Sequence, residues 1–92
     1  MVKKKPHPAV VAKFAALHGL TIDQVKTLVI AGDLVERRGV EWTNEGDKRL
    51  PAYQGAQVAF AVLAQECGFD DYEMNGLYPT LRKGGQDIYL PD

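Results

Sequence analysis

The chain contains no serine among its 92 residues, and Cys67 is its only cysteine. The missing serine excludes hydrolases that use a serine nucleophile. A single cysteine cannot form an internal disulfide and makes a thiolate-bound metal implausible, a pattern that fits the reducing cytoplasm. The strongest apolar run, residues 58–64, is far shorter than the ~20 residues of a membrane-spanning helix. We therefore expect a cytoplasmic protein with no membrane segment, metal or cofactor, and no enzymatic activity.

Charges of both signs are nearly balanced, with 11 lysines and arginines against 12 carboxylates and a net charge of −1. Domains that bind nucleic acid by charge alone usually have a basic excess, so this balance counts against indiscriminate binding. The cations are nevertheless clustered, at residues 3–5, 37–38, 48–49 and 82–83. A chain of this length, with 46% hydrophobic residues, is expected to form one globular domain over residues 1–92.

Two helices joined by a glycine turn are predicted in the first third of the chain. Pro8 suits the first turn of a helix, and Gly19 is expected to end that helix in the left-handed conformation. Thr21 then begins a second helix, since Gln24 three residues later completes a capping-box pattern. We expect this second helix to end at Gly32.

Residues 33–50 have a different pattern, which favours β-structure. Two short strands around Gly39 and a polar turn at residues 44–47 predict a β-hairpin, or wing. Trp42, the only tryptophan, is expected to be a cross-strand anchor in the core.

A third helix is predicted over residues 51–68, with Pro51 in its first turn. It is apolar nearly all round, which is typical of a buried helix or of a subunit interface. In the C-terminal extension, residues 69–92, we predict one short helical turn at 70–75 and a strand at 86–90. The predicted fold class is mostly α with a small β-hairpin.

The run VAKFAALHGLTIDQVKTLVI, from Val11 to Ile30, resembles the helix-turn-helix of DNA-binding regulators. Ala15 is the small residue where the two helices cross, and a glycine follows four residues later at the turn. Val25 and Leu28 occupy the positions that lock the second helix against the first. The resemblance implies a helix-turn-helix at residues 8–32.

The following residues are similar to the winged-helix subgroup that includes phage excisionases and MerR-type regulators. Gly32-Asp33-Leu34 and Arg49-Leu50-Pro51 occur in the order found there, and the resemblance covers residues 8 to about 65. It implies a phage-like regulator of transcription, or a recombination-directionality factor, that binds double-stranded DNA. The wing would lie at residues 33–50, and the helix at 52–67 would support a homodimer.

The resemblance also implies which side chains contact DNA. The second helix would enter the major groove with Thr21, Gln24, Lys26 and Thr27, while Asp23 departs from the pattern because phosphates repel a carboxylate. The wing and a flexible basic arm at residues 1–7 would contact phosphates or the minor groove. Their cations are Arg37, Arg38, Lys48, Arg49, Lys3, Lys4 and Lys5. About six such contacts correspond to a salt slope of roughly −5.

A second class of function is also compatible with the sequence: a small protein-binding inhibitor or interaction module on the same helical frame. Asp23 and the near-zero net charge favour this alternative. Its docking surface is expected where aromatic and apolar side chains lie beside carboxylates, at Asp70, Asp71, Tyr72, Met74 and Tyr78.

Overall fold

The computed structural model describes residues 6–91, and the lysines of the expected basic arm, residues 3–5, lie outside the described residues. The prediction of a mostly α protein with a small antiparallel β element is confirmed. The elements in chain order are the helices α1 (Pro8–His18) and α2 (Ile22–Glu45), the 3-10 turn η1 (Asp47–Arg49), helix α3 (Leu50–Glu66), and the strands β1 (Asp71–Asn75), β2 (Tyr78–Lys83) and β3 (Gln86–Ile88).

Helix α2 is the main departure from the prediction, because it runs without a break through the segment expected to form a wing. Gly32 and Gly39 do not turn the chain; they lie buried on the same side of α2, two turns apart. A Cβ atom at Gly32 would come within 3.0 Å of the Tyr78 hydroxyl, and one at Gly39 within 3.0 Å of the Tyr53 ring. The wing prediction is therefore wrong, because these glycines admit neighbouring side chains.

The aromatic and C-terminal assignments are corrected in part. Trp42 lies on α2 and stacks on Tyr53 of α3, with ring centroids 5.4 Å apart, so it is not a cross-strand residue. The third helix is confirmed, while residues 71–75 form strand β1 where a helical turn was expected. The strand predicted at residues 86–90 is present and ends at Ile88.

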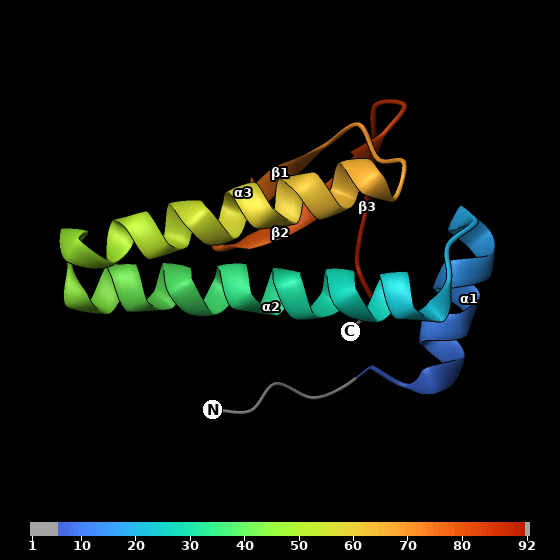
Figure 1. The fold of residues 1–92 in the computed structure, drawn as a ribbon, viewed down its shortest axis with the longest axis horizontal. Helices are drawn as coiled ribbons and strands as arrows, with labels where there is room; N and C mark the ends of the chain where they lie inside the picture. Colours follow the sequence, from blue (N-terminus) through green and yellow to red (C-terminus); the bar gives the residue numbers. More distant parts are fainter. Residues whose placement is uncertain (1–5, 92) are drawn as a thin grey trace.

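Helices α2 and α3 form an antiparallel hairpin, and the three strands cover one face of it (Figure 1). The sheet is antiparallel in the order β1-β2-β3, and its register aligns Tyr72, Leu81 and Ile88 across the three strands. The Tyr72 ring meets Phe60 of α3 edge-on, with centroids 5.6 Å apart. Phe60 and Leu81 are fully buried, so the centre of the core lies between the hairpin and the sheet.

Helix α1 packs across the N-terminal end of α2 (Figure 1). Gly19 ends α1 with φ 68°, as predicted, and the N–H of Leu20 donates to the carbonyl of Ala15 at 2.9 Å. The capping box is also confirmed: Thr21 Oγ1 accepts from the Gln24 N–H at 3.0 Å, and Gln24 Oε1 accepts from the Thr21 N–H at 2.9 Å. Local hydrogen bonds thus end α1 and begin α2 on either side of the turn.

Replacing the capping residue should weaken the fold measurably. We expect Thr21→Ala to lower the free energy of unfolding by about 1 kcal/mol, because the Gln24 N–H loses its acceptor. Urea denaturation followed by circular dichroism measures this loss. The control is Thr27→Ala, at an exposed position inside α2, which should change the stability by less than about 0.5 kcal/mol. Equal losses in both variants would contradict the capping role.

Within residues 6–91, no helix combines the length and the apolar character that crossing a bilayer requires.

Candidate nucleic-acid interface

The end of α1, the turn at Gly19 and the first two turns of α2 form an exposed corner, which we define as residues 13–27. Thr21, which caps α2, is exposed, as are Asp23, Lys26 and Thr27 on the helix, while Gln24 is half-buried. The opposite side of the same turns is anchored in the core by Val25 and Leu28, both fully buried. The polar ridge expected from the sequence, Thr21 to Thr27, therefore faces outward.

Part of the hydrogen-bonding capacity of this ridge is used locally. The Thr21 hydroxyl and the Gln24 carbonyl oxygen are engaged in the capping box, and the Thr27 hydroxyl donates to the carbonyl of Asp23 at 2.8 Å. Two-point recognition of adenine needs both the oxygen and the nitrogen of a glutamine amide. Gln24 would have to leave the capping box to read adenine in this way, so Lys26 is the better placed contact on the ridge.

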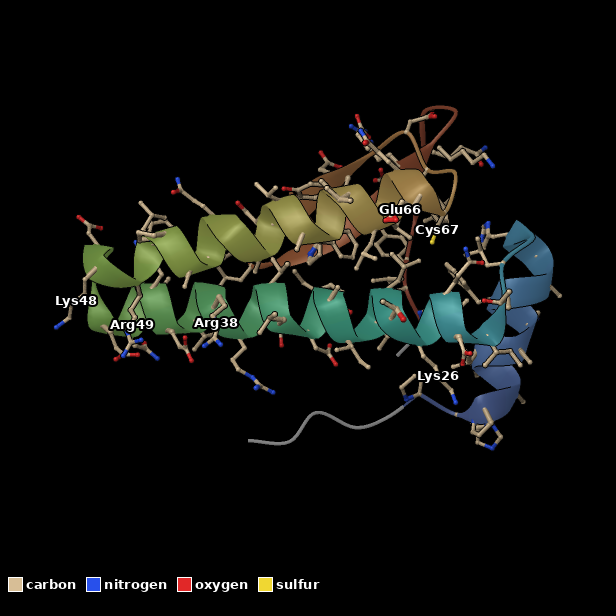
Figure 2. The ribbon with its side chains drawn as sticks, viewed as in Figure 1. Lys26, Arg38, Lys48, Arg49, Glu66 and Cys67 are labelled. Atoms are coloured by element: carbon tan, nitrogen blue, oxygen red, sulfur yellow. The ribbon has the colours of Figure 1, made fainter. Side chains whose placement is uncertain are left out.

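The cations assigned to the wing do not join this ridge. Arg37 and Arg38 lie further along α2, and Lys48 and Arg49 lie at the tip of the hairpin, in η1. Figure 2 shows Lys26, Arg38 and Arg49 spread along the length of α2. Twelve residues separate Lys26 from Arg38, which is ~18 Å of helix. The predicted interface is thus broken into separate parts, because the segment that was expected to fold back is helical.

Two of these arginines are also held by carboxylates. Arg38 pairs with Glu41 at 2.7 Å, and Arg49 pairs with Glu45 at 3.1 Å. Helix α2 as a whole carries five carboxylates and three cations. Its outer surface beyond the corner is therefore mixed in charge and does not form the continuous basic face that a phosphate backbone would require.

The charge of the chain is nevertheless strongly segregated. Residues 1–32 contain five lysines and one carboxylate, Asp23, for a net charge of +4. The remaining 60 residues contain six cations and eleven carboxylates, for a net charge of −5. The corner, with the segment that precedes it, is the basic part of the protein. The net charge of the whole chain does not show this difference between the two segments. It can be found in the sequence by counting the charges of each segment separately.

A shallow hollow of about 230 Å³ adjoins the ridge, between the start of α2 and the end of α3. Burial, followed by the charge of Glu66, raises the pKa of the Cys67 thiol, which therefore stays protonated at neutral pH and is a poor nucleophile. Figure 2 places Glu66 and Cys67 at this end of α3. With Asp23 and Glu66 in its walls, the hollow is unsuited to a phosphate. Its lining is Asp23, Gln24, Thr27, Leu28, Leu63, Glu66 and Cys67.

The alternative protein-docking residues do not form a single surface. Tyr72, Met74 and Tyr78 pack against the core, and burial, followed by the interaction with Tyr53, raises the pKa of Tyr72. Asp70 and Asp71 are exposed, and Asp70 accepts a hydrogen bond from the N–H of Gly84 at 2.9 Å. Successive side chains of a strand point to opposite faces, so β1 separates its carboxylates from its apolar residues. This predicted surface is therefore not supported.

Among the residues that the structure describes, no three or more His, Cys, Asp and Glu side chains are grouped so that they could hold a metal ion. The groups available for binding at the corner are hydrogen-bonding side chains and the charges of Lys13, Lys26 and Asp23. Comparison of the chain with protein-family models, with curated proteins and with solved structures gives no match.

Proposed function

We propose that this chain binds double-stranded DNA through the corner, as a regulator or a recombination-directionality factor. One observation carries the proposal: an exposed polar ridge, Thr21 to Thr27, lies on the segment of the chain with a net charge of +4. A helix that enters the major groove needs an exposed polar face near its N-terminus and nearby cations that neutralise phosphates. The corner has such a face, and its exposed cations are Lys13 and Lys26.

The contacts proposed at the corner differ from those expected for a winged protein. Lys26 on α2 and Lys13 on α1 are both exposed, and α1 crosses the end of α2 as the first helix of such a pair crosses the DNA backbone. Asp23 would be tolerated where it accepts a hydrogen bond from a cytosine amine. Without the wing arginines, at most five lysines neutralise phosphates, so the salt slope is expected to be no steeper than about −4.5.

Fluorescence anisotropy of a labelled mixed-sequence duplex, titrated over a salt series, tests this proposal. We expect Lys13→Gln and Lys26→Gln each to weaken binding and to flatten the salt slope by about 0.9, the share of one phosphate contact. Asp23→Asn should strengthen binding to unrelated sequences, because it removes a charge that phosphates repel. The matched control is Lys83→Gln, an exposed lysine of β2. No binding at low salt, or an equal loss in the control, would refute the assignment.

A protein-binding module is the second candidate, and a specific observation favours it. Ile30 and Leu34, one turn apart on α2, are 69% and 37% exposed, beside Arg37. Apolar pairs at this spacing are used when a helix binds in a groove of another protein. The duplex titration separates the candidates, since a module of this kind should show no binding that depends on Lys13 and Lys26.

A further inference from the structure

The outer face of α3 is exposed and uncharged. No Asp, Glu, Lys or Arg occurs from Leu50 to Gln65, although Val58 and Val62 are 64% and 51% exposed. Gly55 and Ala59 lie on the same face, because residues 55, 58, 59 and 62 are linked by spacings of three and four, and a Cβ at Gly55 would meet nothing within 4 Å. A helix that faces water normally carries charged residues on that side. The outer face of α3 therefore has the composition of a surface that packs against another protein chain.

We propose that a second copy of this chain covers it, with the two α3 helices packed antiparallel about a two-fold axis between residues 58 and 59. In this register, Val62 of each chain faces Gly55 of the partner subunit, and Val58 faces Ala59 of the partner subunit. Each large side chain thus meets a small one, which is the condition for close helix packing. The homodimer expected from the apolar helix at 52–67 thereby acquires a defined geometry.

The self-complementarity of the face is the reason to choose a second copy as the occupant. A two-fold interface uses the same residues on both subunits, so any charge near the axis would face a like charge. The stretch from Leu50 to Gln65 contains none. The pairing of valine with glycine or alanine is symmetric about one point of the helix, and a partner of unrelated sequence would not require such symmetry.

The size of the face sets the expected strength of the dimer. A 17-residue helix is ~25 Å long and ~10 Å wide, so α3 alone would bury on the order of 300–400 Å² per subunit. Stable complexes bury about 800 Å² per partner. We therefore expect a weak dimer, which forms only at high protein concentration. The proposal is independent of DNA binding.

Sedimentation velocity from low micromolar to about 1 mM tests the dimer. The wild-type chain should pass from monomer to dimer across this range. Val62→Glu and Gly55→Lys should each weaken association at least about tenfold, and the double variant should recover it, because each introduced carboxylate would face an introduced ammonium group of the partner. The matched control is Leu17→Glu, at a 74% exposed leucine of α1, which should dimerise like the wild type.

Each outcome is decisive because all three substituted positions are exposed and the fold of every variant is checked by its melting temperature. A wild-type chain that stays monomeric at all concentrations would overturn the proposal, as would a Val62→Glu variant that still dimerises fully. If the double variant fails to recover, the antiparallel register is wrong, since a parallel pair would place each position against itself. Anisotropy at nanomolar protein reports on DNA binding separately.

Discussion

Phe60→Ala is expected to lower the free energy of unfolding by about 3–5 kcal/mol. Phe60 is fully buried on α3, and its ring contacts Tyr72 of β1. The substitution leaves a cavity between the helical hairpin and the sheet, where Leu81 is also fully buried. Domains of this size are typically stable by about 5–15 kcal/mol, so this single change would remove a large share of the total.

Urea denaturation at low micromolar protein, followed by circular dichroism and by tryptophan fluorescence, measures this loss. The control is Val58→Ala, two residues away on the same helix but 64% exposed, which should change the stability by less than about 0.5 kcal/mol. Comparable losses at the two positions would mean that α3 is not buried on the side of Phe60.

Gly39→Leu is expected to have the second largest effect, a loss of about 1–3 kcal/mol or more. A Cβ atom at this position would lie 3.0 Å from Tyr53 Cε1 and 3.1 Å from Leu77 Cδ2. A leucine side chain would therefore push α2 away from both α3 and the β1–β2 turn. In an exposed hairpin turn, by contrast, this glycine would have no close neighbours, so the size of the effect also distinguishes the continuous α2 from a wing.

The control for this variant is Gly55→Leu, at an exposed helical glycine with open space around its Cα. It should stabilise the monomer by up to about 1 kcal/mol, because leucine favours the helix over glycine. Thermal melting at low micromolar concentration, where the chain is monomeric, compares the two. A Gly39→Leu variant that melts at or above the wild-type temperature would rule out the close packing described at this position.

The corner was predictable because its signals are local. Pro8 in the first turn of α1, the left-handed Gly19, and the pairing of Thr21 with Gln24 each involve residues at most four positions apart. Such signals act through backbone geometry and short hydrogen bonds, so they do not depend on the rest of the fold. The exposed ridge followed from them, since the apolar Val25 fixes which side of α2 is buried.

The segment from 33 to 50 was not predictable in the same way. Its glycines have the composition of a turn, and only Tyr53 and Tyr78, distant in the sequence, reveal that they serve helix packing. A periodic signal was nevertheless present. The positions that face the core alternate at spacings of three and four once glycine is counted as a buried residue, at 25, 28, 32, 35, 39 and 42. The chain turns instead at Gly46, where φ is 94°.

Of the candidate site, only the residues in the corner were predicted at the correct place in the fold. Arg37 and Arg38 were expected in a wing but lie on α2, because this helix continues to Glu45. Where α2 ends depends on its tertiary packing. The apolar members of the C-terminal docking surface were misplaced for a related reason. A helical turn was expected at residues 70–75, whereas 71–75 form a strand, whose alternation turns Tyr72 and Met74 toward the helices.

The length of α2 has a mechanical consequence. Twenty-four helical residues make a rod of ~36 Å, which occupies most of the molecule's longest dimension of 40 Å. Because no hinge interrupts the rod between Ile22 and Glu45, its two extremities keep a constant separation. A compact ligand can therefore engage only one extremity at a time, whereas an elongated one can span both without bending the protein.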